Sequence, residues 1–133
     1  MNKTFITLLL LVAAMMTTPC LHADSEAKAV ATFLATEGDL GYIKEENGPV
    51  QYIFKLTNTG NAPLVIIDAI PSCGCTAADY PKQPIAVGDT VDVRIIFDPT
   101  GFRGAFTKDI TVKTNGKKRR TTLQIIGSVI PKN

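Results

Sequence analysis

Residues 50–63 read VQYIFKLTNTGNAP, in which apolar and polar side chains alternate until a turn-forming cluster follows. Period-two alternation places one set of side chains on a buried face, so it predicts a strand over residues 50–58. The inward set is Val50, Tyr52, Phe54 and Leu56. Glycine, asparagine and proline over residues 59–63 predict the turn that ends this strand.

Short runs of the same kind occupy the rest of the chain, separated by glycines and prolines. They predict strands over residues 29–36, 64–70, 90–98, 105–114 and 121–130. Residues 64–70 are largely apolar and lie between two prolines, which favours a strand buried on both faces. Gly38 and Gly41 are expected to break the chain after the first strand, and residues 77–89 to be mostly loop.

This pattern of about seven short strands, with no long segment of helical periodicity, predicts an all-β fold. A single open sheet would leave its apolar face exposed, so a second sheet must cover it. The expected architecture is therefore an immunoglobulin-like β-sandwich with Greek-key connections. A chain of 133 residues, 45% of them hydrophobic, is long enough for one such domain and too apolar to be disordered.

The N-terminus has the order of a secretory signal peptide. Lys3 is followed by an apolar run over residues 5–16 and then by small and polar residues ending at Ala23. A run of about 12 apolar residues is shorter than the ~20 that span a bilayer as a helix. The mature protein is therefore expected to be exported, either periplasmic or extracellular. The predicted division of the chain is a signal peptide over residues 1–23, a short leader over residues 24–31 and one domain over residues 32–130.

Cys20 raises an alternative, because bacterial lipoproteins are cut immediately before a cysteine that is then lipidated. Pro19 and the polar residues before it fit the usual cleavage pattern poorly, so lipid anchoring is the less favoured prediction. Contact with a membrane is expected only if Cys20 is lipidated, since the attached acyl chains would then anchor the protein.

Removal of residues 1–23 would leave a chain with no histidine, because His22 is the only one. Without histidine the chain can form no Ser-His-Asp triad, no Cys-His pair and no imidazole zinc site. The acidic residues are scattered, with no recognisable catalytic pairing. We therefore expect no enzyme activity, with thiol redox chemistry as the one exception, and no cofactor.

The formal net charge of +2 is too small to indicate binding to nucleic acid or to an anionic membrane, both of which require a concentrated basic face. One basic run, Lys117-Lys118-Arg119-Arg120, follows the hairpin-turn dipeptide Asn115-Gly116. We interpret this run as a solvated turn that also discourages edge-to-edge pairing of strands. An anion-binding patch is the alternative.

Ser72-Cys73-Gly74-Cys75-Thr76 is the segment with the most distinctive chemistry, and three interpretations of its cysteines remain open. In the first interpretation, the two cysteines form a strained, redox-labile disulfide, assisted by the freedom of Gly74 to bend. In the second, they pack as free thiols at the end of a buried strand. In the third, which is the least favoured, their thiolates bind a soft ion such as Cu(I). In an extended strand the Cα atoms of Cys73 and Cys75 would lie roughly 6.6 Å apart, near the upper limit for a bridge.

The turn motif formed by Asn58, Gly60 and Pro63 has a structural interpretation. Gly60 suits a positive φ, and the side chain of Asn58 is expected to bond its own backbone. Asp98-Pro99-Thr100-Gly101 is likewise predicted to be a turn, with the proline fixing φ.

Three elements together resemble a known family: residues 54–64 (FKLTNTGNAPL), residues 72–76 (SCGCT) and Phe97-Asp98-Pro99. Over about residues 32–130 the chain resembles the bacterial DUF1573 domain. That family is similar to the immunoglobulin-like modules of major sperm protein, PapD-type chaperones and ASH domains, which implies the same sandwich. Leu40 stands where family members usually have an aromatic residue, and it still supplies an apolar plug. The resemblance implies no established activity.

We expect an exported immunoglobulin-like module that binds an unidentified protein partner in the cell envelope or serves a structural role there. Sandwich domains of this type bind partners through an exposed strand edge. The alternative, from a different class, is a thiol redox or Cu(I)-handling protein acting through Cys73-Gly74-Cys75.

Overall fold

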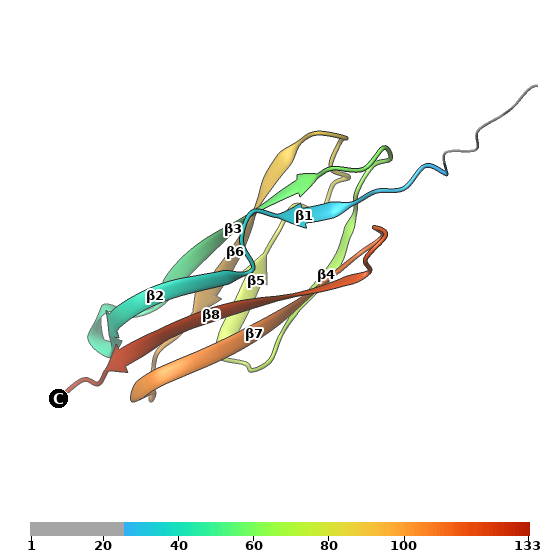
Figure 1. The fold of residues 1–133 in the computed structure, drawn as a ribbon. Helices are drawn as coiled ribbons and strands as arrows, with labels where there is room; N and C mark the ends of the chain where they lie inside the picture. The colour runs from blue at the N-terminus through green and yellow to red at the C-terminus, as the bar shows by residue number, and fades with distance from the viewer. Residues whose placement is uncertain (1–25) are drawn as a thin grey trace, which may run out of the picture.

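Two four-stranded sheets packed face to face form the domain in the computed structural model, which describes residues 26–133 (Figure 1). In chain order the elements are β1 (Ala31–Phe33), β2 (Glu37–Lys44), the 3₁₀ turn η1 (Glu45–Asn47), β3 (Val50–Asn58), β4 (Ile66–Pro71), β5 (Thr76–Asp79), β6 (Thr90–Phe97), β7 (Gly104–Thr114) and β8 (Arg120–Ile130). The strand order is β1-β3-β6-β5 in one sheet and β2-β8-β7-β4 in the other. The predicted all-β, immunoglobulin-like sandwich is confirmed, with eight strands in the described residues.

The predicted signal peptide over residues 1–23 and the candidate lipidation site Cys20 lie outside the described residues. Within residues 26–133, no helix is long and apolar enough to cross a membrane.

The central strands of both sheets supply the core, because each presents alternate apolar side chains to the space between the sheets. The hydrophobic core side chains that are at most 1% exposed are Phe54, Leu56, Leu64, Val93, Ile95, Phe97, Ile110, Val112, Leu123 and Ile125. The rings of Phe97 and Phe106 stack from opposite sheets, with centroids 4.4 Å apart. Full burial of one such side chain contributes about 1.5–3 kcal/mol, so this interior dominates the stability of the fold.

The prediction that residues 64–70 are buried on both faces is wrong. β4 lies at the edge of its sheet, where it pairs only with β7. An edge strand covers the core with one face, and β4 does so through Ile66 and Ala69. Ile67 and Ile70 are 58% and 42% exposed. The apolar run therefore combines a buried face with an exposed apolar one.

Two further segments differ from the sequence prediction. Gly38 and Gly41 do not break the chain but lie within β2, which pairs in parallel with β8. Gly41 has a φ of 65° next to a shift in the pairing register, which only glycine adopts without strain. Residues 77–89 are mostly loop, as predicted, but the first three of them belong to β5, which pairs with β6. A strand this short carries too little alternation to be recognised in sequence.

The connection between β7 and β8 lies where the sequence predicts it, between the strands predicted over residues 105–114 and 121–130. Residues 115–119 form it, closed by a hydrogen bond from the amide of Thr114 to the carbonyl of Arg119 (2.9 Å). Gly116 is buried there and packs against Ala29 of the N-terminal segment. Asn115-Gly116 thus connects the β7–β8 loop to the N-terminal segment at Ala29 instead of forming a tight two-residue turn.

The interpretation of the basic run as a guard against edge pairing is also wrong. Arg120 begins β8, and the three basic residues before it lie in the β7–β8 loop. β8 lies between β2 and β7, and β7 lies between β8 and β4. Neither strand is an edge, so charge in their connecting loop protects no edge.

Asn58, the last residue of β3, is completely buried and fully hydrogen-bonded. Its Oδ1 accepts from the amides of Gly60 (3.1 Å) and Val30 (3.4 Å). Its Nδ2 donates to the carbonyls of Ala62 (2.8 Å) and Ile85 (3.0 Å). The predicted bond of Asn58 to its own turn is present, but the side chain also fixes Val30, which precedes β1, and the segment before β6. One residue therefore ties together segments that are far apart in the chain.

Gly60 does not have the positive φ that the sequence suggested. A Cβ at this position would overlap the backbone of Lys28 and Val30, which pass directly beside it. Glycine is required here because two backbones approach closely, and Pro63 completes the exposed turn that follows.

Asn58→Ala is expected to destabilise the domain by about 2–4 kcal/mol, because it leaves buried amides and carbonyls without partners. The matched control is Asn61→Ala, which removes one exposed hydrogen bond to the amide of Lys28 and should cost less than about 1 kcal/mol. Urea unfolding measures both changes. Equal losses in the two variants would contradict the role assigned to Asn58.

Glu45 ties the opposite end of the sandwich together. Its carboxylate accepts from the amides of Gly101 (3.0 Å) and Lys132 (2.8 Å), which joins η1 to the β6–β7 loop and to the C-terminal segment. These backbone hydrogen bonds hold the pKa of Glu45 below its ordinary value.

A lowered pKa means that Glu45 stabilises the fold above the ordinary glutamate pKa and ceases to do so as the pH falls. Glu45→Gln should therefore weaken the loss of stability between about pH 5 and pH 3, as measured by unfolding at a series of pH values. Glu46→Gln is the control, because the Glu46 carboxylate makes no hydrogen bond in the described residues. A control that flattens the profile as much as Glu45→Gln would contradict this prediction.

Candidate functional site

The Cys-Gly-Cys segment forms the connection by which the chain leaves one sheet and joins the other. β4 ends at Pro71 and β5 begins at Thr76. The amide of Ser72 donates to the carbonyl of Asp109 (2.8 Å), and the hydroxyl of Ser72 accepts from the amide of Asp109 (3.3 Å). The amide of Asp98 donates to the carbonyl of Cys75 (2.9 Å). The segment is thus anchored to β7 on one side and to the end of β6 on the other.

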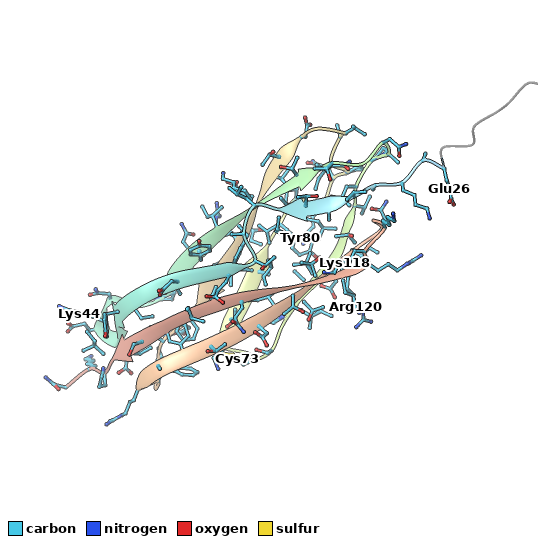
Figure 2. The ribbon with its side chains drawn as sticks, viewed as in Figure 1. Glu26, Lys44, Cys73, Tyr80, Lys118 and Arg120 are labelled. Carbon is cyan, nitrogen blue, oxygen red and sulfur yellow. A yellow bond between two sulfur atoms is a disulfide. The ribbon has the colours of Figure 1, made fainter. Side chains whose placement is uncertain are left out.

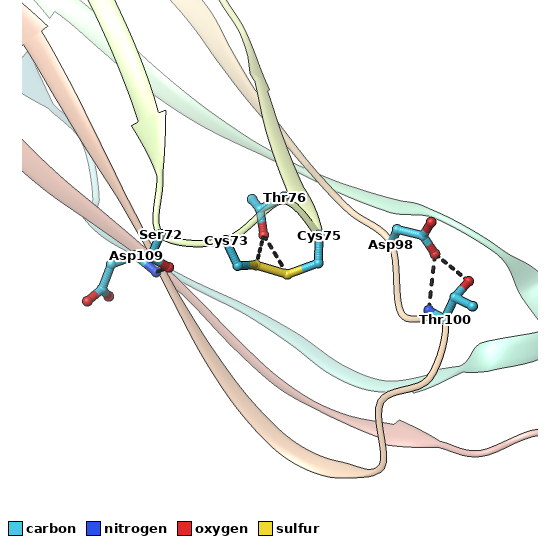
Figure 3. The surroundings of a disulfide bond; sticks show 7 residues. All are labelled: Ser72, Cys73, Cys75, Thr76, Asp98, Thr100 and Asp109. Atoms are coloured by element: carbon cyan, nitrogen blue, oxygen red, sulfur yellow. Dashed lines mark hydrogen bonds between the residues drawn. A yellow bond between two sulfur atoms is a disulfide. The ribbon is translucent and has the colours of Figure 1, made fainter.

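Cys73 and Cys75 form a disulfide within this segment (Figure 3). Their Cα atoms lie 5.3 Å apart, closer than in an extended strand, because the chain turns. A hydrogen bond from the amide of Thr76 to the carbonyl of Cys73 (3.3 Å) closes that turn. The turn, and not an unusual φ at Gly74, brings the two sulfurs together.

Thr76 supports the disulfide from the interior. Its side chain is 4% exposed, and its hydroxyl lies 3.7 Å from each sulfur. Cys73 and Cys75 are partly exposed and Gly74 is exposed, so a small reagent can reach the bond. The site therefore has a polar inner side and an open outer side.

Asp98 and Thr100 lie nearby in Figure 3, in the loop that follows β6. The carboxylate of Asp98 accepts from both the amide (3.0 Å) and the hydroxyl (2.7 Å) of Thr100, and these bonds lower its pKa. Gly101 follows with a φ of 80°, which completes the predicted turn. Asp98 is committed to this turn and is poorly suited to act as a base.

The disulfide excludes thiolate binding of a metal while it is intact, since both sulfurs are used. In residues 26–133 no group of three or more His, Cys, Asp or Glu side chains is placed to share a metal ion. Cu(I) ligation would therefore need the reduced form and ligands from elsewhere.

The structure does not bring the two predicted motifs together. The turn motif of Asn58, Gly60 and Pro63 precedes β4, and the Cys-Gly-Cys segment follows it. β4 separates the two, and its exposed Ile67 and Ile70 form a surface that the sequence prediction missed. Asp68 was the available signal, because a carboxylate in the middle of an apolar run argues against burial on both faces.

The comparisons with known proteins concern the whole sandwich. A family profile described as "Protein of unknown function (DUF1573)" matches residues 31–129, and no curated protein sequence matches the chain. A protein of unknown function from Porphyromonas gingivalis W83 is similar in structure, with a TM-score of 0.68 and 18% identity over 82% of this chain and 51% of that one. The VesB protease of Vibrio cholerae has a TM-score of 0.60 and 17% identity over 76% of this chain and 32% of that one. The YadV chaperone has a TM-score of 0.52 and 16% identity over 80% of this chain and 53% of that one.

At these identities the structural likeness shows the fold alone, and the chain spans about half the length, or less, of the solved structures it matches. The family profile extends from the first strand to the last and agrees with the resemblance seen in the sequence. The chain belongs to the DUF1573 family.

Proposed function

We propose that this domain is a non-catalytic module of the cell envelope that binds an extended segment of a protein partner along the outer edge of β4. The observation that supports this proposal is the exposure of Ile67 and Ile70 on an edge strand. An edge strand offers backbone donors and acceptors to an added strand, and exposed apolar side chains beside them supply further contact.

The other three edges are less suitable for adding a strand. β1 has three residues and β5 has four, which leaves little backbone to pair. β2 is longer and, like β4, contains an irregularity in its pairing register, but Tyr42 is its one exposed large apolar side chain, whereas β4 exposes both Ile67 and Ile70. β4 has six residues between its two connections.

Asp68 gives this edge a chemical preference. Its carboxylate is exposed and accepts from the amide of Ala69 (2.8 Å), so it shields one backbone donor of β4 while the edge is free. A partner strand would replace this local bond, and a basic side chain opposite Asp68 would compensate for it. We therefore expect a partner segment with apolar residues on one face and a basic residue near its centre.

A photo-crosslinking residue introduced at Ile67 or Ile70 should capture one defined envelope protein in intact cells. The matched control is Val87, which is 53% exposed but belongs to the connection between β5 and β6 and not to β4. Ile67→Asp combined with Ile70→Asp should abolish the crosslink formed from a probe placed at Thr111 on the neighbouring β7. Equal capture from position 87, or no capture from positions 67 and 70, would contradict the proposal.

A thiol redox role is the second candidate, favoured by a disulfide between residues only two apart. Such a bridge closes almost no loop, so it contributes little to stability by restricting the unfolded chain. Exchange with a dithiol would transfer two electrons and two protons to Cys73 and Cys75 and would leave the donor as a disulfide. The open outer side of the site gives a donor thiolate access to the bond.

Changing both cysteines to serine should lower the free energy of unfolding by less than about 2 kcal/mol, because the loop is so short. If the pair has a redox role, the native protein should exchange disulfides with a small dithiol at a measurable equilibrium, and the serine variant should not. Thiol alkylation followed by intact mass measures the exchange. A serine variant that fails to fold would show that the pair is structural, and a native bond that resists dithiols would argue against redox function.

A further inference from the structure

Positively charged side chains gather at the end of the sandwich where β7 turns into β8. This basic end consists of Lys28, Lys113, Lys117, Lys118, Arg119 and Arg120. Figure 2 shows Lys118 and Arg120 at the same end as Glu26, the first described residue, and Lys44 at the opposite end. Lys113 and Arg120 lie directly opposite each other in the β7–β8 pairing, where like charges are destabilising.

The fold brings Lys28 to the basic run from a distant part of the sequence. Lys28, Lys117 and Arg119 line one pocket of about 290 Å³. The amide of Lys117 donates to the carbonyl of Ala29 (2.9 Å), which fixes the loop against the N-terminal segment. A second pocket of about 170 Å³ is lined by Ile67, Lys113, Thr114, Arg119 and Arg120. Arg119 lines both pockets, so the basic end is one continuous surface.

Few acidic groups offset this charge. Glu26 pairs with Lys28 at 3.3 Å, and Asp68 lies opposite Lys113 with its carboxylate bonded to the amide of Ala69. No ion pair of the described residues involves any of the four consecutive basic residues 117–120. The rest of the described domain carries more acidic than basic side chains, so a small net charge conceals a strongly uneven distribution.

We propose that the basic end binds the surface of a bilayer that contains anionic phospholipids. The described chain begins at this end, and the apolar run of residues 5–16 precedes it in sequence. Residues 17–27 connect that run to Lys28 and span at most about 40 Å when fully extended. Before the predicted cleavage after Ala23, while the apolar run is in a membrane, the basic end is the part of the domain tethered closest to the headgroups.

Electrostatics then favours contact, because lysine and arginine near an anionic leaflet are attracted to it, by roughly fivefold in affinity per residue. The attraction acts within about a Debye length, which the short connection makes accessible. Neutralisation by lipid phosphates would also relieve the repulsion between Lys113 and Arg120. The folded domain thereby supplies the concentrated basic face that the net charge of +2 did not indicate.

The full chain should bind vesicles of 70% phosphatidylethanolamine and 30% phosphatidylglycerol more tightly than vesicles with phosphatidylcholine in place of the anionic lipid, and added salt should remove the difference. The triple variant Lys117→Gln, Lys118→Gln and Arg119→Gln should reduce this preference at least tenfold. The apolar run and Lys3 are the same in every variant, so their own affinity for lipid cancels in the comparison.

The matched control removes the same charge from exposed positions outside the basic end, Lys44→Gln, Arg103→Gln and Lys132→Gln, and should keep the preference. Exchange of Lys117 and Lys118 for arginine and of Arg119 for lysine should also keep it, which separates charge from folding effects. Equal losses in the basic-end variant and the control would overturn the proposal. Salt-sensitive binding of the basic end to a DNA duplex or an anionic polysaccharide, with no preference among vesicles, would show that the partner is another polyanion.

Orientation provides a second test, because the sequence contains no tryptophan and an introduced one is a unique probe. Tryptophan at Ala27, which lines the pocket of the basic end, should be quenched by brominated lipids in anionic vesicles. Tryptophan at Asn47, in η1 at the opposite end, should not. Quenching of both probes alike, or of Asn47→Trp alone, would exclude docking through the basic end.

Discussion

The buried side chain of Asn58 is the interaction on which the organisation of one end of this domain depends. It satisfies two amides and two carbonyls that come from the N-terminal segment, from its own turn and from the segment before β6. Its backbone amide and carbonyl are also bonded, to Asp89 and Gly88. A group so enclosed is costly unless every bond is made, so the arrangement of these segments is strongly specified. By fixing Val30, Asn58 also fixes the neighbouring Lys28 beside the β7–β8 loop.

A second constraint comes from the need of each sheet to cover the other. The described chain changes sheet five times, at every connection except β5–β6 and β7–β8. The change from β4 to β5 is made by the Cys73–Cys75 turn, whose residues are bonded to β7 and to Asp98 at the end of β6. Because these backbone hydrogen bonds hold the crossover in place, the disulfide contributes little to keeping it there. A redox role for the disulfide is therefore worth testing, whereas the proposed binding role of the domain does not depend on redox chemistry.

The sequence predicts the central strands of this fold far better than its edge strands. Alternation over residues 50–58 and 90–98 identified Phe54, Leu56 and Phe97 as core residues, because central strands in a sandwich have one buried face and a regular period. β4 was misjudged because its apolar residues suit an edge strand as well as a doubly buried one, and Asp68, the one residue that separates the two cases, was given too little weight.

The candidate sites show a similar contrast, because features formed by neighbouring residues were predicted and features formed by tertiary contacts were missed. The Cys-Gly-Cys motif was visible because both cysteines are close in sequence, although the turn that brings their Cα atoms to 5.3 Å was not. The role of Gly60 was misread as conformational, since nothing local reveals that Lys28 passes beside it. The meeting of Lys28 with Lys117 depends on tertiary structure alone, and no local pattern could have indicated it.

The proposed surfaces follow from one geometric relation, the direction of β4. Ile66, at its start, pairs with Thr114 beside the basic end, and Pro71, at its finish, leads into the disulfide turn. A domain held at a membrane by the basic end would therefore present the β4 edge running away from the bilayer. A partner strand on that edge would pass from Arg119 and Ile67, which share a pocket, towards Cys73. The charge of the basic end would then set the orientation of the domain on the membrane. The β4 edge and the disulfide would in consequence face a partner that lies farther from the bilayer.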